Sequence, residues 1–495
     1  MWNKAVLHDL IEEKLKGYRF IVVANREPYI HQFDGNEIRC LRPASGMATA
    51  LDPIMMASGG TWIAHGSGSA DKSVVDARDR IAVPPEEPTY TLRRVWLTKE
   101  QESGYYSGLA NGGLWPLCHV TFTRPVFDPK HWEAYKEVND LFARAVLEEA
   151  GGQPTFVFVQ DFHFCLLPRM LKQMSIGNLI IAQFWHIPWP ARHIFQAFPW
   201  ADELLDGLLG NDLLGFHTHA HCQNFLETVD RTLETRIDPE KMEITRQGKV
   251  TVVRAFPISI DYEDHVEDAR SPLVGDLMTS WHQRLGLKDG QFLGVGIERL
   301  DFTKGIPDRL RGLDWLFEQH PEYIGKLVFL QVAVPSRGEV VQYQQLATEV
   351  DDLTAGLNRK WARNGWQPII LLKEHQGRQD MMALHRLASF CVVSSLHDGM
   401  NLVAKEFVAS RFDEAGALVL SKFTGAANEL SDALLVNPFA VQELGEAMHQ
   451  ALIMPPEEQR RRMTKMRAEV ERNNVYRWAG KALSALLKFD FPENV

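Results

Sequence analysis

Short apolar runs alternate with longer helical patterns along most of the chain, and this alternation constrains the fold more than any other feature. Runs such as Leu179–Phe184 and Leu327–Val334 are apolar almost throughout, and helical patterns such as Trp132–Glu149 lie between them. Strands that are buried on both faces of a parallel sheet have this composition. The sequence therefore predicts doubly wound parallel sheets of the α/β class. The predicted strands are Tyr18–Ala24, Phe156–Val159, Leu179–Phe184, Leu213–Phe216, Val250–Phe256, Phe292–Ile297, Leu327–Val334, Ile369–Leu372, Phe390–Ser394, Ala417–Leu420 and Ala433–Val436.

The chain is too long for a single hydrophobic core. It has 495 residues, whereas one core stops growing near about 250–300 residues. A strand ends in the Pro-containing, acidic segment Pro257–Asp268, which is the natural break. We predict Rossmann-like domains over residues 1–260 and 261–475, and a C-terminal helix over 476–495 that crosses back to the first domain. Ligands of open α/β sheets bind outside the carboxyl ends of the strands, so two such domains facing each other would form a deep cleft.

Charge and composition exclude several classes of partner. Lys and Arg number 53 and Asp and Glu 64, which gives a net charge of −11. This balance disfavours nucleic acid or an anionic membrane as the main partner, although a local basic pocket remains compatible with it. No run approaches the roughly 18 apolar residues of a spanning helix. The five cysteines form no CxxC pair, which is typical of reduced thiols in a cytoplasmic protein.

The segment ERLDFTKG, Glu298–Gly305, connects an apolar strand to a helical pattern. Arg299 and Lys304 lie in this one loop and can converge on one anion. A departing nucleoside diphosphate needs its new negative charge neutralised, which a metal or fixed cations can do. Two cations in a loop also fit a solvated surface pair. The position directly after a buried strand favours the anion site.

A second segment, LHDGMNLVAKEFVAS, follows the strand FCVVSS. Asp398 lies in the turn, and Gly399 lets the backbone approach a ligand closely. The next residues begin a helix whose first amides can bind phosphate, and Glu406 lies about two turns further on. An acid in the turn can bind sugar hydroxyls, and the later one can hold a ribose. Alternatively the two acids are a helix N-cap and a surface residue.

Polar side chains also follow two strands of the N-terminal half. Asp161 comes after FVFV with only Gln160 between, and His186 follows LIIAQFW. Both are expected to face the cleft, although buried polar residues at such positions are often purely structural. The alternating histidines of FHTHAHC would share one face of a strand and could bind zinc. The strand ends at Phe216, however, and a helix spreads this spacing around its axis, so we predict no metal site.

These segments together resemble the trehalose-6-phosphate synthases, which are retaining nucleotide-sugar glycosyltransferases of the two-domain GT-B fold. The likeness extends from about Tyr18 to Trp478 and is most specific in RLDFTKG, PSRGEV, DGMNLVAKEFVAS and FTGAANEL. It implies a cytoplasmic transferase that moves glucose from a nucleotide-glucose, UDP-glucose being expected, to glucose-6-phosphate. It implies no metal and no bound cofactor, because the nucleotide-sugar is a co-substrate. It also implies small-molecule partners and self-association.

The resemblance assigns roles residue by residue. On the donor side it implies Gly46, Arg299, Lys304, Asp398, Gly399, Met400, Asn401, Leu402, Val403 and Glu406. On the acceptor side it implies Arg26, Tyr106, Trp115, Asp161 and Arg337. The residues implied in the transfer itself are Arg299, Lys304, Asp398 and His186. No side chain need act as a nucleophile, since the departing phosphate oxygen can take the acceptor's proton on the face where the new bond forms.

The departures from the family pattern lie on the acceptor side. Glu27 stands in NREP where a small or apolar residue is usual, His65 stands where Trp is frequent, and Gln160 replaces a His. Glu27 would repel an acceptor phosphate unless it pairs with a cation. REPY is also similar to glucosylglycerol-phosphate synthases, so glycerol-3-phosphate is the alternative acceptor. A binding protein without turnover is the other alternative. A nicotinamide oxidoreductase is disfavoured, because Gly294–Gly296 is only a fragment of the dinucleotide fingerprint.

Overall fold

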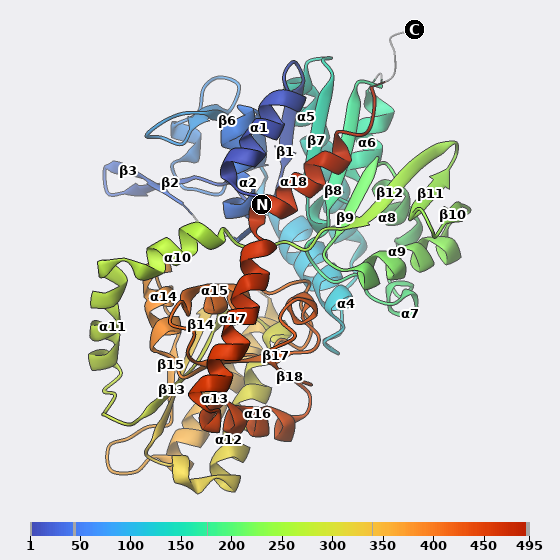
Figure 1. Cartoon of the computed structure of the whole chain (residues 1–495). Coiled ribbons are helices and arrows are strands. Elements are labelled where there is room, and N and C mark those ends of the chain that lie inside the picture. The colour runs from blue at the N-terminus through green and yellow to red at the C-terminus, as the bar shows by residue number, and fades with distance from the viewer. Residues whose placement is uncertain (1, 43–45, 176, 339, 492–495) are drawn as a thin grey trace. The chain divides into compact units, whose positions relative to one another are not determined.

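A computed structural model of the chain describes every residue except 1, 43–45, 176, 339 and 492–495. The chain divides into two compact units (Figure 1). Unit 1 comprises Met1–Ile258 and Val475–Val495, and unit 2 comprises Ser259–Asn474. Both units are α/β, with strands hydrogen-bonded mainly in parallel and helices between them, so the predicted fold class is confirmed.

Unit 1 is built on a sheet with ten strands in the described part of the chain. Its parallel strands, in spatial order, are β12 (Lys249–Ala255), β9 (Leu213–Phe216), β8 (Leu179–Phe184), β7 (Thr155–Gln160), β1 (Arg19–Val23), β4 (Thr61–His65) and β6 (Tyr90–Val95). Antiparallel strands extend both edges, with β5 (Arg80–Val83) beside β6 and with β11 (Glu243–Arg246) and β10 (Arg236–Asp238) beyond β12. The hairpin β2 (Ile30–Asp34) and β3 (Glu37–Leu41) forms a separate small sheet.

Helices cover both faces of this sheet. On one face Trp478 of α18 (Val475–Leu486) contacts Phe158 and Phe184, and α18 also packs against α1 (Lys4–Lys14) and α2 (Gly46–Ser58). On the other face α5 (Pro129–Ala150) packs against β1 and β4. The remaining helical segments of unit 1 are η1 (Asp71–Ser73), α3 (Lys99–Glu102), η2 (Ser103–Leu114), α4 (Trp115–His119), η3 (Phe162–Phe164), α6 (Leu167–Met174), α7 (Arg192–Phe195), α8 (Ala201–Leu208) and α9 (His219–Thr232).

Unit 2 has one parallel sheet, with six strands among the described residues. The strands in spatial order are β15 (Ile369–Leu372), β14 (Leu327–Pro335), β13 (Phe292–Leu300), β16 (Phe390–Val393), β17 (Ala417–Ser421) and β18 (Leu434–Val436). The helices are α10 (Tyr262–Arg270), α11 (Pro272–Arg284), η4 (Phe302–Lys304), α12 (Ile306–Gln319), η5 (Pro321–Tyr323), α13 (Val341–Trp361), α14 (Arg378–Leu387), α15 (Leu402–Ser410), η6 (Gly425–Asn428), α16 (Val441–Ile453) and α17 (Pro456–Arg472).

One segment of unit 1 is helical although it contains several glycines. Gly104–Pro116 belongs to the wide helix η2 and the start of α4. A Cβ at Gly104 would lie 2.7 Å from the Ala134 Cβ, and one at Gly108 would lie 2.5 Å from the His131 ring. These glycines therefore allow close packing against α5 and do not mark a loop. No helix among the described residues is long and apolar enough to cross a membrane.

Candidate functional site

In unit 2, the loop after β13 places Lys304 against Asp398. Lys304 ends η4, and its Nζ donates to Asp398 Oδ2 at 2.6 Å. Gly305 then adopts a φ of +61°, and a Cβ there would lie 2.3 Å from the carbonyl oxygen of Ser394. The turn can thus press against the end of β16 only with glycine at this position. It brings a cation and an acid that are far apart in sequence into contact at the carboxyl ends of neighbouring strands.

Three cations converge around Asp301, which lies between the two proposed donor cations in sequence and is fully buried. Its burial raises the pKa of the carboxyl, but Arg337, Arg299 and Lys304 outweigh this effect and hold the pKa below its usual value. Arg337 Nη1 lies 3.1 Å from Asp301 Oδ2. Arg337 has a φ of +51°, an unusual value for a residue with a side chain. The excess of positive charge makes this edge of the sheet suitable for an anion such as a diphosphate.

Asn401 fixes the turn that carries Asp398. Its Oδ1 accepts from the amide of Ala404 at 3.0 Å and caps α15, while its Nδ2 donates to Asp398 Oδ2 at 3.2 Å. Gly425 supports the turn from the other side, since its amide donates to the carbonyl of Asp398 at 3.1 Å. A Cβ at Gly425 would lie 2.1 Å from the carbonyl oxygen of Gly399, which explains why FTGAANEL needs glycine there.

The remaining donor residues proposed for unit 2 come directly after this turn in the sequence. Met400 is buried, and Leu402 and Val403 form the first turn of α15, where the amides have no partner within a helix. Glu406 lies on the same helix, and burial raises the pKa of its carboxyl. Unit 2 therefore brings the predicted residues of both segments to one edge of its sheet. Gly46, the donor residue predicted in the other half of the chain, begins α2 of unit 1.

In unit 1, Asp161 and His186 follow the neighbouring strands β7 and β8, as their positions in sequence suggest. Asp161 has a φ of +71°, and its Oδ1 accepts from the amide of His186 at 3.2 Å. His186 Nε2 lies 3.0 Å from Gln160 Oε1. Burial lowers the pKa of His186 to about 3, so its imidazole is neutral at pH 7. The neutral ring therefore has one nitrogen hydrogen-bonded to the Gln160 side chain.

The other proposed acceptor residues of unit 1 lie on three elements. Arg26 is exposed after β1, and its Nη2 donates to the Tyr106 hydroxyl at 3.4 Å. Tyr106 belongs to η2 and stacks on His163, with ring centroids 5.8 Å apart. Trp115 begins α4 and is 7% exposed. Arg337, the remaining residue predicted for the acceptor, lies in unit 2 and pairs with Asp301.

Two groups of histidines bear on metal binding. Thr218 caps α9, which begins at His219, so the histidines of FHTHAHC do not share a strand face. Among the described residues, His320, Glu322 and His449 form the one group whose ligand atoms lie within 4.8 Å of one another. The rings of His320 and His449 stack with their centroids 3.7 Å apart. A ligand nitrogen binds a metal in the plane of its ring, so these rings would have to separate to share an ion.

Sequence reasoning missed two residues that shape the site, Asp301 and Arg94. Asp301 stands inside a recognised motif, but nothing in the sequence shows that it is buried among cations. Arg94 belongs to a strand that was not predicted, and it pairs with Glu27 at 2.8 Å. This pairing supplies the cation that Glu27 needs.

The chain is similar over nearly its whole length to known glycosyltransferases. The model of glycosyltransferase family 20 matches residues 18–488. The trehalose-6-phosphate synthase of Mycolicibacterium vanbaalenii is 37% identical over 484 residues, which cover 96% of this chain and 97% of that protein. The UDP-forming alpha,alpha-trehalose-phosphate synthase of Botryotinia fuckeliana is 34% identical, over 96% of this chain and 90% of its own.

The fold of the chain is also similar to that of solved structures. The E. coli protein bound with UDP-2-fluoro glucose superposes with a TM-score of 0.85 at 30% identity, covering 95% of this chain and 99% of that one. The Burkholderia xenovorans alpha,alpha-trehalose-phosphate synthase in complex with glucose-6-phosphate gives 0.84 at 29% identity, covering 94% and 99%. Because the family model matches residues 18–488, nearly the whole sequence, the chain belongs to glycosyltransferase family 20, and its likeness to the solved structures shows that it is of the GT-B type.

Proposed function

We propose that the chain is a retaining glucosyltransferase that transfers glucose from UDP-glucose to glucose-6-phosphate and forms trehalose-6-phosphate. The observation that carries this proposal is the convergence of Arg299, Lys304 and Arg337 around buried Asp301, beside an Asp398 that Lys304 and Asn401 hold in place. Related proteins of matching length are named as UDP-forming trehalose-phosphate synthases, and related structures hold a UDP-glucose analogue or glucose-6-phosphate.

The donor's diphosphate would lie against Arg299, Lys304 and the first amides of α15, its glucose against Asp398, and its ribose against Glu406. In the transfer, the bond between the glucose C1 and the phosphate oxygen breaks, and a bond from C1 to the acceptor hydroxyl oxygen forms on the same face. The acceptor's proton passes to the departing phosphate oxygen. The cations stabilise the charge that develops on that phosphate, and orientation supplies much of the rest.

In unit 1, Arg26 would bind the acceptor's phosphate, since one guanidinium group can donate two parallel hydrogen bonds to phosphate oxygens. Neutral His186 would serve as a hydrogen-bond partner of the glucose rather than as an acid or base at pH 7. Tyr106 and Asp161 would complete the acceptor site.

An acceptor panel tests this function. Glucose-6-phosphate, glycerol-3-phosphate and glucose are each incubated with UDP-, ADP- and GDP-glucose, and the products are identified by mass and anomeric NMR. We expect UDP-glucose and glucose-6-phosphate to give the fastest release of nucleotide and a product with both anomeric centres α. Faster transfer to glycerol-3-phosphate would assign the alternative acceptor, and binding without release would indicate a sensor.

We also expect transfer to survive a strong chelator with less than about a twofold change in rate. Fixed cations can supply the charge stabilisation that a divalent ion gives in other transferases. The measurement is the rate of UDP release after dialysis against EDTA, with and without added Mg²⁺. Complete loss that Mg²⁺ restores would refute the metal-independent mechanism.

A further inference from the structure

Glu27 follows Arg26 directly, yet its side chain lies in the interior of unit 1 and is 1% exposed. Its Oε1 accepts from the amide of Ser67 at 3.0 Å and from the Ser67 hydroxyl at 3.1 Å. Its Oε2 accepts from Arg94 Nε at 2.8 Å. Arg26 itself is exposed. The turn after β1 thus has one side chain anchored inside the unit and the preceding one directed to the surface.

Arg94 joins Glu27 to a second buried carboxylate. Its guanidinium is fully buried, and its Nη2 lies 2.9 Å from Asp71 Oδ1 and 2.9 Å from His31 Nδ1. Asp71 also accepts from the amides of His31 at 2.8 Å and Gly68 at 2.6 Å. Glu27, Asp71, Arg94 and His31 therefore form one buried network that connects the turn after β1 with β2, η1 and β6.

The network carries one negative charge in excess when both carboxyls are ionised, because a single guanidinium faces two carboxylates. His31 does not balance it, since burial and Arg94 lower the pKa of its imidazole. Cys40 on β3 interacts electrostatically with Arg94, Asp71 and Glu27, but its thiol stays neutral because burial raises its pKa. Burial, together with the hydrogen bond to Asp71, raises the pKa of Glu27 to about 7. One proton taken up near neutral pH would make the network neutral.

We propose that Glu27 is a positioning residue for the acceptor's phosphate: its buried network fixes the turn that presents Arg26 and couples phosphate binding to the uptake of one proton. The inference rests on the proposed function, which places the acceptor's phosphate at Arg26. A phosphate bound at Arg26 repels the negative charge of the network and therefore favours its protonated, neutral form. Because this coupling is reciprocal, the protonated network binds the phosphate more tightly than the ionised one.

The sign of the pH effect follows from this linkage. A sugar phosphate is largely dianionic above pH 7, because its second pKa is about 6, so the acceptor itself changes little in charge from pH 7.0 to 8.5. Over this range the network loses its proton. We therefore expect the acceptor KM to rise about fivefold, up to a limit of tenfold per pH unit for one coupled proton, while the KM for UDP-glucose stays constant.

Three variants separate positioning from stability. Glu27→Gln resembles the protonated state and should give an acceptor KM that is nearly independent of pH. Glu27→Ala removes the anchor and should raise the acceptor KM about tenfold at every pH, on the scale of one lost charged hydrogen bond, with the donor KM unchanged. Glu149→Gln is the matched control: it is a buried carboxyl of the same unit, 2.8 Å from Arg80 Nε.

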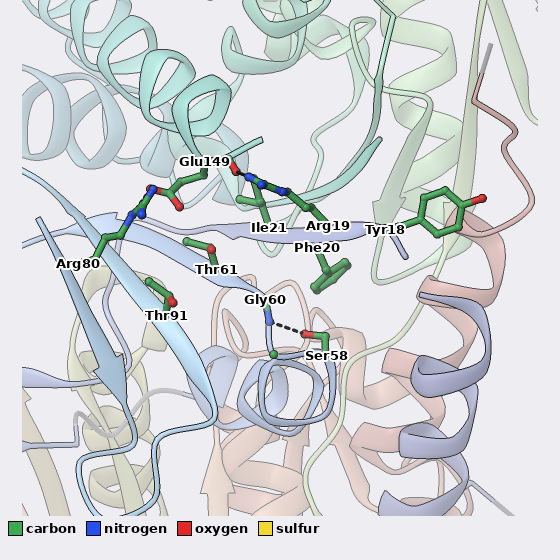
Figure 2. Close-up of a pocket in the computed structure, with 11 residues that line it drawn as sticks. Tyr18, Arg19, Phe20, Ile21, Ser58, Gly60, Thr61, Arg80, Thr91 and Glu149 are labelled. Carbon is green, nitrogen blue, oxygen red and sulfur yellow. Dashed lines mark hydrogen bonds and ion pairs between the residues drawn. The ribbon is translucent and has the colours of Figure 1, made fainter. Parts of the chain in front are cut away.

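Figure 2 shows Arg80 and Glu149 facing each other in a cavity of about 340 Å³. Arg19, Gly60 and Thr61 also line this cavity, at the amino-terminal ends of β1 and β4 and therefore away from Arg26. Loss of the Glu149 carboxylate should lower thermal stability and leave the pH dependence of the acceptor KM as in the wild type. The proposal would be overturned if the acceptor KM of Glu27→Gln still rose with pH. It would also be overturned if the rise were lost in Glu149→Gln as well as in Glu27→Gln. Equal effects of Glu27→Ala on both KM values would also overturn it.

Calorimetric binding of glucose-6-phosphate across the same pH range distinguishes this inference from the proposed function. If binding weakens as the pH rises in the wild type but not in Glu27→Gln, the role of the network is supported even if no glucose is transferred. Transfer with an acceptor affinity that does not depend on Glu27 would leave the function standing and reject the network. Absence of both binding and transfer would reject both.

Discussion

Lys304→Ala is expected to lower kcat/KM for glucose transfer by roughly 100-fold or more, which is the scale of losing one preorganised charge donor. Lys304 Nζ lies 2.6 Å from Asp398 Oδ2, so the substitution also releases the carboxylate proposed to bind the glucose. Arg299→Ala should produce a loss of the same order, because Arg299 is another of the cations around buried Asp301 that are proposed to bind the diphosphate. The measurement is steady-state UDP release with both substrates varied.

Lys360→Ala is the control for this experiment. Lys360 also pairs with a carboxylate of unit 2, at 2.8 Å from Asp314, but it is 42% exposed and lies at the end of α13. Its loss should leave kcat/KM within about twofold, as for a surface ion pair. Near-normal rates in both Lys304→Ala and Arg299→Ala would contradict the assignment of the donor site.

Arg309→Met is expected to destabilise the chain by about 3–5 kcal/mol, because it leaves a buried carboxylate without its cation. Arg309 on α12 is 1% exposed, and its guanidinium contacts Glu298, Gln331 at 2.7 Å and Ser394 at 3.0 Å. Burial already raises the pKa of Glu298 in the presence of Arg309. The measurement is the free energy of unfolding from urea titrations.

Arg311→Met, on the same helix, is the matched control. Arg311 pairs with Glu349 at 2.6 Å, and both side chains are nearly half exposed, so its loss should cost less than about 1 kcal/mol. The double variant Glu298→Gln with Arg309→Met should recover part of the lost stability. Equal losses in Arg309→Met and Arg311→Met would show that the buried pair does not stabilise unit 2.

The strands that the sequence revealed most clearly have uninterrupted apolar runs. Leu179–Phe184 and Leu213–Phe216 match β8 and β9, because every residue of these strands is buried. Strand β6 was missed because it carries Arg93 and Arg94. A buried strand can contain Arg94 only because Glu27 and Asp71 neutralise it, and a pairing over such sequence separations leaves no local signal.

The role of a glycine can likewise depend on residues that are distant in the sequence. The fragment GVG suggested part of a dinucleotide fingerprint, but Gly296 serves another purpose. A Cβ there would lie 2.0 Å from Arg309 Nη1, so glycine makes room for the guanidinium that pairs with Glu298. The order of residues along a motif could be recognised in the sequence, whereas the space that each residue needs depends on partners from other elements.

The proposed donor site is decided by a crystal structure of this chain with UDP-2-fluoro glucose bound. We expect the diphosphate oxygens to lie within hydrogen-bond distance of Arg299 and Lys304, with the sugar ring against Asp398. A fully occupied donor whose phosphates lie far from both cations, with Arg299 and Lys304 directed to solvent, would contradict the account.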